Sequence, residues 1–204
     1  VAALNEGLAA ATQVTDACVA AVRSLVDHPA EVRSIDVYLR IENEIVLMSS
    51  SRRDDQSTAA RVDLARVVDG EVLVVRGPDT AATDTAATYT ADPARPAELV
   101  ALPIGAAFGG LAGAIVLSLN PRRPFDDGYL GFVHVLVDTI TSAIEGAYRR
   151  TVELGEYRRI SDTLQAAMLS PASDLPTIAA RYLPATTNLA VGGDWYDVVD
   201  VDGQ

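Results

Sequence analysis

The sequence is poor in the residues that mark disulfide-rich and nucleic-acid-binding proteins. It contains one cysteine, so no internal disulfide can form, which fits a reducing cytoplasm. It contains no lysine; the 16 basic residues are all arginine, against 28 acidic residues, giving a formal net charge of −12. Binding of nucleic acid or of an anionic membrane needs clustered basic side chains. The composition therefore disfavours both partners, and we take the absence of lysine as a compositional bias of the source.

Long apolar runs are also missing. No run reaches membrane-spanning length and no signal peptide is visible, so we expect a cytoplasmic protein without a membrane segment. Apolar residues still make up 49% of the 204 residues, which is enough for a core in one or two domains. Because the chain begins in helical sequence and stops just after a predicted turn, we expect it to belong to a longer protein.

The longest uninterrupted pattern is helical and covers residues 126–170. Apolar residues recur through it at three- and four-residue steps, no proline interrupts it, and a proline flanks each end. Asp126 or Asp127 is expected to cap its first turn. Unbroken, such a helix would be about 65 Å long, which is more than one small domain covers. We therefore expect it to belong to one domain at its start and to another at its end.

The residues before this helix predict an antiparallel sheet with helices on one side, because short turns join most of the strands. The strand over 35–41 is expected to be half-buried, since its apolar residues alternate with Asp36, Tyr38 and Arg40. Residues 77–97 contain a direct repeat and few large apolar side chains, which predicts a surface loop. The expected elements are a helix over 1–27, strands over 35–41 and 44–50, a short helix over 59–68, and strands over 71–75, 98–104 and 111–119.

Three segments near the end of this region carry a resemblance to a known family. They are Leu102-Pro-Ile104, the strand Leu111–Leu119, and Arg123-Pro-Phe125 followed by two aspartates. In this order they resemble the end of a GAF domain, and the resemblance covers roughly residues 1–150. It implies an α+β fold, with a GAF-like antiparallel sheet flanked by helices and a long C-terminal connecting helix. It does not imply a particular ligand, so the ligand-binding residues stay unknown.

The last part of the chain resembles the beginning of a different domain. The matching segments are Leu164–Pro171, Ala180–Ala185 and Val191–Asp197. They resemble the opening of a SpoIIE-like, PPM-type serine/threonine protein phosphatase, of the kind found in actinobacterial-type sigma-factor regulators. The resemblance implies that residues 171–204 form a short β fragment of a phosphatase domain, and that the parent protein is a metal-dependent phosphatase.

Asp194 is the candidate metal ligand. It follows two glycines, where the backbone can approach a ligand closely, and it begins a predicted strand. Side chains alternate on a strand, so Asp194 and Asp197 cannot both bind one ion, and Asp194 is at most one ligand of a hard-cation site. The resemblance implies that Asp194 helps to bind Mn²⁺ or Mg²⁺ together with carboxylates beyond Gln204. We therefore expect these 204 residues to hold no complete catalytic site, to bind no metal and to be inactive.

Some GAF domains attach a bilin to cysteine or bind haem through histidine. Here Cys18 lies on the apolar face of the first predicted helix, so we expect a buried structural thiol. His28 precedes a proline at the end of that helix, where it is expected to cap it. His134 lies in the middle of the long helix, and we expect it to be partly buried.

A small-molecule pocket, if there is one, is expected between the sheet and the segments 52–70 and 77–97. Four arginines of the first segment would favour an anionic ligand, unless they are solvated surface charges. They are Arg52, Arg53, Arg61 and Arg66.

The second half of the long helix favours a partner helix. Beyond Tyr148 its charged residues leave only a narrow apolar stripe, and a seven-residue register places the polar Arg150 and Ser161 at core positions. We expect a parallel homodimer through this helix.

The expected organisation is a GAF-like sensor domain over 1–148, a helical linker over 149–170, and truncated phosphatase strands over 171–204. The expected function is that of the regulatory sensor region of a phosphatase. Its phosphoprotein substrate would be a phosphoserine anti-sigma-factor antagonist, as the resemblance implies. The alternative is a ligand-free dimerisation or docking scaffold.

Overall fold

A computed structural model describes residues 7–26, 30–52, 58–76, 84–85, 97–105 and 110–168. The chain divides into two units, Val1–Arg149 and Arg150–Gln204, and the boundary falls inside helix α4 (Asp127–Met168). The division into three parts that the sequence suggests, at 148/149 and 170/171, stays a prediction.

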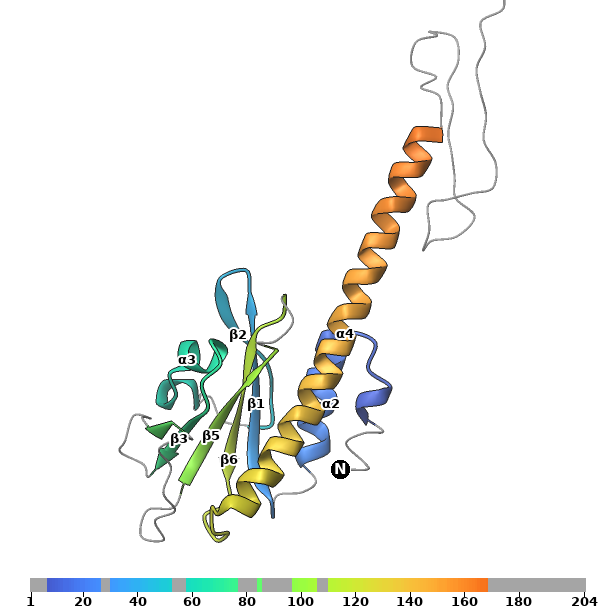
Figure 1. Cartoon of the computed structure of the whole chain (residues 1–204). Helices are drawn as coiled ribbons and strands as arrows, with labels where there is room; N and C mark the ends of the chain where they lie inside the picture. The colour runs from blue at the N-terminus through green and yellow to red at the C-terminus, as the bar shows by residue number, and fades with distance from the viewer. Residues whose placement is uncertain are drawn as a thin grey trace, which may run out of the picture. The chain divides into compact units, whose positions relative to one another are not determined.

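An antiparallel sheet forms the centre of the first unit (Figure 1). Its strand order is β2-β1-β6-β5-β3-β4, and each paired neighbour runs antiparallel. The strands are β1 (Val32–Ile41), β2 (Glu44–Ser50), β3 (Leu73–Arg76), β4 (Asp84–Thr85), β5 (Ala97–Ile104) and β6 (Gly113–Leu119). The predicted α+β fold class is confirmed. In the segment predicted as a surface loop, residues 84–85 form the short strand β4 and residue 97 begins β5, while 77–83 and 86–96 lie outside the described residues.

The hairpin between β1 and β2 turns at Glu42-Asn43, the two residues between the predicted strands 35–41 and 44–50, with Glu42 in the left-handed region at φ 57°. The expectation that β1 is half-buried is wrong. Asp36 and Tyr38 are only 2% and 3% exposed, because side chains cover this strand from both faces of the sheet. The alternation in the sequence showed which residues of β1 share a face. It did not show that other side chains also cover the face that carries Asp36 and Tyr38.

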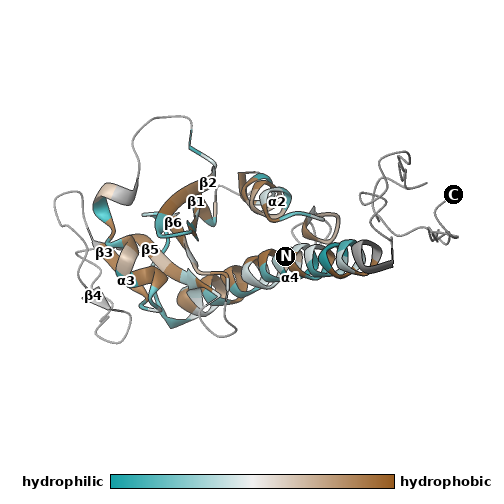
Figure 2. Ribbon diagram, turned by 90° about the horizontal axis from the view of Figure 1, so that it is seen from above, coloured by the Kyte–Doolittle hydropathy of each residue, from teal (hydrophilic) through white to brown (hydrophobic). Residues whose placement is uncertain are grey.

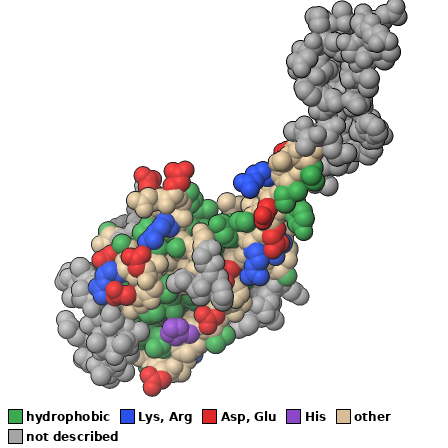
Figure 3. All heavy atoms as spheres, turned by 45° about the horizontal axis from the view of Figure 1, so that its top comes forward, with side chains coloured by type: hydrophobic (Ala, Val, Ile, Leu, Met, Phe, Trp, Pro, Cys, Tyr) green, Lys and Arg blue, Asp and Glu red, His purple; other side chains and the backbone are tan. Residues whose placement is uncertain are grey.

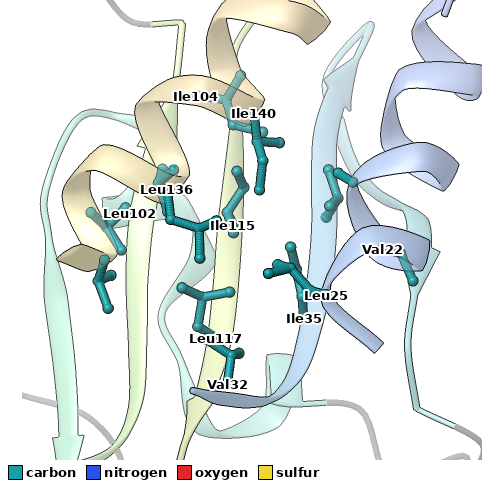
Figure 4. Packing of buried hydrophobic residues seen from close by; sticks show 14 of the residues in the cluster. Val22, Leu25, Val32, Ile35, Leu102, Ile104, Ile115, Leu117, Leu136 and Ile140 are labelled. Atoms are coloured by element: carbon teal, nitrogen blue, oxygen red, sulfur yellow. The ribbon is translucent and has the colours of Figure 1, made fainter. Parts of the chain in front are cut away.

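Helix α2 (Val14–Val26) and the first part of α4 cover one face of the sheet (Figure 1). Figure 4 shows Leu25 of α2 beside Ile35, while Leu136 and Ile140 of α4 lie over Leu102, Ile104 and Ile115. This is the larger hydrophobic core, and it includes Cys18 and Ala147. Its position explains why apolar residues recur at helical spacing in both helices.

The predicted single helix over residues 1–27 is wrong. The chain turns at residues 10–13, between a helical turn at residues 7–9 and α2, and the Ala11 N–H donates to the carbonyl oxygen of Leu8 at 3.2 Å. Leu8 and Ala11 are nevertheless buried, so the apolar spacing continued across the break and concealed it.

Helices also cover the opposite face, which corrects the expectation of helices on one side only. The 3₁₀ helix η1 (Thr58–Arg61) and helix α3 (Leu64–Val68) replace the predicted helix over 59–68. Asp63 separates them, because its carboxylate accepts a hydrogen bond from the Arg66 N–H at 3.4 Å and caps α3. Val67 and Val68 of α3 join a second core formed with residues of β3, β5 and β6.

Helix α4 begins where the sequence predicted. The Asp126 carboxylate accepts a hydrogen bond from the Tyr129 N–H at 2.8 Å, which is N-cap geometry. The Tyr129 hydroxyl donates to the Glu31 carbonyl oxygen, and Arg123 pairs with the Glu31 carboxylate and lies 4.7 Å over the Tyr129 ring. These contacts attach the start of α4 to the segment before β1.

The composition of α4 changes along its length. Figure 2 shows apolar brown over its first part and more teal toward its C-terminal end. Helix α4 is long and apolar enough to cross a membrane, judged by length and composition alone. The expectation that no segment reaches membrane-spanning length is therefore not confirmed. A core helix of a soluble protein passes the same test, and Val133, Ile140 and Ile144 of α4 are indeed fully buried in the first unit.

Candidate ligand-binding site

A cavity of about 440 Å³ opens beside β1, β5 and β6, within the size range of small-ligand pockets. Sheet register brings its floor together, since Ser118 of β6 lies opposite both Ser34 of β1 and Leu99 of β5. The remaining lining comes from the ends of strands, the segments that follow them and the 3₁₀ helix η1. The full lining is Arg33, Ser34, Ser51, Arg52, Arg61, Glu98, Leu99, Ser118, Leu119 and Pro121.

The cavity is basic although the protein is acidic. Three arginines and one glutamate line it, in a chain whose formal net charge is −12. Arg61 of η1 donates to the Glu98 carboxylate of β5 at 2.9 Å, and both side chains are about one-third exposed. An ion pair with this exposure contributes at most about 1 kcal/mol to stability, so Arg61 can exchange its partner at little cost.

Hydroxyl groups form the second polar element of the cavity. Ser34 Oγ donates to Ser118 Oγ at 2.7 Å, and Ser51 Oγ accepts a hydrogen bond from the Ile35 N–H at 2.9 Å. Ser118 and Ser51 therefore act as acceptors in these bonds, and each keeps its hydroxyl proton for donation to a further acceptor. The cavity thus presents hydroxyl donors next to guanidinium groups.

A buried carboxylate fixes the end of β2 next to the cavity. Ser50 Oγ donates to Asp36 Oδ1 at 2.5 Å and accepts from the Arg52 N–H at 3.0 Å. Asp36 is 2% exposed and lies opposite Ser50 in the sheet register. This short chain of bonds holds the backbone of Arg52 in place at the wall of the cavity.

Of the four arginines that the sequence singled out, two line the cavity. They are Arg52 and Arg61, while Arg53 lies outside the described residues. Arg66 instead donates to Glu71 at 2.6 and 3.1 Å, and this hydrogen bond raises the pKa of Arg66 above its ordinary value. Sequence reasoning missed Arg33, whose only signal was its position just before the predicted strand.

The other candidates from the sequence divide into described and undescribed residues. Cys18 is fully buried, and burial raises the pKa of its thiol from 9.0 to about 11, which confirms a structural thiol. His134 is partly buried as expected. His28, Asp194 and Asp197 lie outside the described residues, so what the sequence indicates about them stays a prediction. In the described part of the chain, no three His, Cys, Asp or Glu side chains gather as a metal site requires.

No family model matches the chain. Solved structures that it resembles include the GAF domain of a phosphoenolpyruvate-protein phosphotransferase from Acinetobacter, at 14% identity over 72% of this chain and 90% of that one, with a TM-score of 0.49. The corresponding GAF domain from Coxiella burnetii gives 15% identity, coverage of 73% and 92%, and a TM-score of 0.48. A GAF domain/HD domain protein from Geobacter sulfurreducens gives 15% identity, coverage of 72% and 98%, and a TM-score of 0.46. At these identities the likeness concerns the fold alone.

Proposed function

We propose that this chain is the regulatory sensing region of a cytoplasmic, metal-dependent serine/threonine protein phosphatase. In this proposal the sheet domain senses a small molecule, and α4 connects it to a phosphatase domain that begins near residue 171. The observation that carries the sensing role is the cavity, where Arg33, Arg52 and Arg61 gather beside the sheet of an acidic protein. A long helix that contains the boundary between two units suits a connecting role.

The phosphatase part of the proposal depends on the sequence segments that end with Gly193-Asp194 and the residues after it. Asp194 would supply one carboxylate ligand of an Mn²⁺ or Mg²⁺ site, and carboxylates beyond Gln204 would supply the others. When bound, such metal ions activate a water for attack on the phosphorus of a phosphoserine. The proposed substrate is a phosphoserine anti-sigma-factor antagonist.

The test is a phosphatase assay on two proteins. One is this chain alone, and the other continues it through the downstream phosphatase segments. We expect Mn²⁺-dependent release of phosphate from a phosphoprotein only with the longer protein. Asp194→Asn in that protein should lower the rate by at least about tenfold, because changes around a metal site commonly cost that much. Activity in the 204 residues alone, or full activity of Asp194→Asn, would refute the proposal.

The second half of α4 supports a further element of the proposal, a parallel homodimer. Between residues 150 and 164 its apolar side chains are exposed to an unusual degree: Val152 48%, Leu154 58%, Tyr157 68%, Ile160 50% and Leu164 55%. Leu154, Tyr157 and Leu164 follow three- and seven-residue spacing, which suits contact with a second helix. On the face that Figure 3 draws, green hydrophobic side chains alternate with charged ones along this helix.

The same exposed side chains favour the alternative function, a dimerisation or docking scaffold without a ligand. The two functions differ in the cavity, since a scaffold needs no ligand there. A thermal-shift screen of small metabolites separates them, because a ligand at 100 times its Kd adds about 2.7 kcal/mol to the free energy of unfolding. A screen in which no compound raises the melting temperature would favour the scaffold.

A further inference from the structure

We infer that the cavity binds a small phosphate ester, and that it holds the phosphate group through the guanidinium groups of Arg33, Arg52 and Arg61. This inference names the ligand class for the sensing unit and in that respect rests on the proposed function. The site itself depends only on residues described in the first unit.

The charge of the lining favours a dianion. A phosphate monoester carries about −1.5 to −2 charges at neutral pH and offers three acceptor oxygens, whereas a carboxylate carries a single charge. Three arginines line the cavity, and Glu98 is the one acidic residue among the lining residues. In the described part of the chain Arg33 makes no ion pair. A doubly charged group would balance the excess positive charge, and a single carboxylate would not.

The hydroxyl donors favour a group with several oxygens. Ser51 and Ser118 both act as acceptors in the bonds that hold them, so each retains a proton for a ligand oxygen. Arginine forks bind phosphate oxygens in pairs, and these bonds are charge-assisted. Guanidinium and hydroxyl donors together outnumber what the two oxygens of one carboxylate can accept.

The size and the walls of the cavity favour an ester over the free ion. A water molecule occupies about 30 Å³ in the liquid, so a cavity of about 440 Å³ is several times larger than one phosphate ion needs. Leu99, Leu119 and Pro121 contribute apolar surface to the lining. We therefore expect the phosphate group to lie against the arginines and an organic group to fill the remaining space.

Glu98 competes with the ligand for Arg61. Its carboxylate accepts from Arg61 Nη2 at 2.9 Å, at the position where a phosphate oxygen would bind. Its negative charge also repels the ligand. Removing this charge should therefore tighten binding, which is the opposite of the effect of removing an arginine.

The test is isothermal titration of the 204-residue chain at about 0.1 M NaCl with inorganic phosphate, glycerol 3-phosphate and the monocarboxylate glycerate. We expect both phosphate compounds to bind, the ester more tightly, and glycerate to bind at least about tenfold more weakly. Arg61→Gln and Arg33→Gln should each weaken binding of the ester by about tenfold, the loss typical of one charge-assisted hydrogen bond. Glu98→Gln should tighten it severalfold.

Arg66→Gln is the matched control, because Arg66 comes from the same segment but pairs with Glu71 outside the cavity. It should leave binding unchanged. The inference fails if neither phosphate compound binds or if glycerate, with its single carboxylate, binds as tightly as the ester. It also fails if Arg66→Gln weakens binding as much as Arg61→Gln, or if Glu98→Gln weakens it. The titration needs no phosphatase activity. If this chain binds the phosphate ester but the longer protein shows no phosphatase activity, the proposed function is refuted and the site is not. If the longer protein is an active phosphatase but this chain binds no phosphate ester, the site is refuted and the proposed function is not.

Discussion

At the scale of single residues, Cys18 links burial to a measurable dependence of stability on pH. Its thiol is fully buried and its pKa is raised from 9.0 to about 11, so the folded chain holds this proton more tightly than the unfolded chain does. The stabilising contribution is therefore complete below about pH 9 and is lost as the pH rises toward 11.

Replacing Cys18 by alanine should remove this part of the pH dependence. We expect the free energy of unfolding of the natural chain to exceed that of Cys18→Ala at pH 8, and the difference to shrink by roughly 1–2 kcal/mol at pH 10.5. Denaturant unfolding of both proteins at the two pH values measures it. Other groups that titrate in this range cancel in the comparison. A difference that stays constant with pH would show that the thiol titrates normally in the folded state.

Gly113 at the start of β6 is a position where a side chain does not fit. A Cβ there would lie 2.3 Å from the carbonyl oxygen of Tyr38 and 2.7 Å from Leu39 Cδ2, whereas a Cβ at Gly131 of α4 would meet nothing within 4 Å. Gly113→Ala should lower the free energy of unfolding by about 1–3 kcal/mol, as overpacking does. Gly131→Ala, the control, should raise it by up to about 1 kcal/mol. Urea unfolding checks both, and an equal effect of the two changes would contradict the close approach of β6 to β1.

At the scale of elements, the start of α4 depends on one cap. The Asp126 carboxylate accepts the Tyr129 N–H at 2.8 Å. Asp126→Ala should therefore lower the free energy of unfolding by about 1 kcal/mol, since the N–H loses its partner. Asp126→Asn should cost much less, because asparagine is as good a cap. Thermal unfolding of the two variants distinguishes them, and equal losses would mean that the charge of Asp126 matters more than its hydrogen bond.

The exposed apolar side chains of α4 lead to a prediction about oligomeric state. We expect the complete chain to have twice the mass of one chain by light scattering. Leu154→Glu combined with Leu164→Glu should give a monomer, because buried like charges destabilise a parallel helix pair. Val135→Glu changes an apolar side chain of the same helix that is 57% exposed but lies outside the 150–164 segment, so it should leave the dimer intact. A natural chain that is already monomeric would contradict the homodimer.

The elements themselves follow closely from local sequence. The spacing of apolar residues located α4, the five longer strands and the hairpin at Glu42-Asn43. The spacing did not reveal the break between the helical turn at residues 7–9 and α2. Leu8 and Ala11 are buried on either side of the start of the turn at residues 10–13, so the apolar pattern of one continuous helix is kept. The spacing also did not predict a helix boundary that one side chain sets: Asp63 caps α3 and thereby separates it from η1.

At the scale of the whole molecule, the cavity could be predicted only in part. Arg52 and Arg61 belong to a segment that the sequence already associated with a pocket. Arg33 and Ser118 come from distant parts of the chain, and only the register of β1 with β6 brings them together. The register of two strands depends on how side chains pack on both faces of the sheet. The sequence of each strand alone does not show which residues of the other strand lie opposite it.

The same two strands connect the cavity with α4. Glu98 and Ser118 line the cavity at one end of β5 and β6. The chain between the other ends of these strands approaches α4 so closely that a Cβ at Gly110 would lie 3.0 Å from the Tyr148 hydroxyl oxygen. A ligand that shifts β5 against β6 would therefore act on α4 just before the boundary between the two units.

Amide hydrogen exchange of the complete chain, with and without saturating inorganic phosphate, tests most directly whether this molecule is a sensor. We expect slower exchange in β1, β5 and β6 beside the cavity, together with altered exchange in α4 around Tyr148 and beyond. Neither change should occur in Arg61→Gln at the same phosphate concentration. Exchange that phosphate leaves unchanged in α4 of the natural chain would contradict the claim that the cavity and the helix form one sensing device.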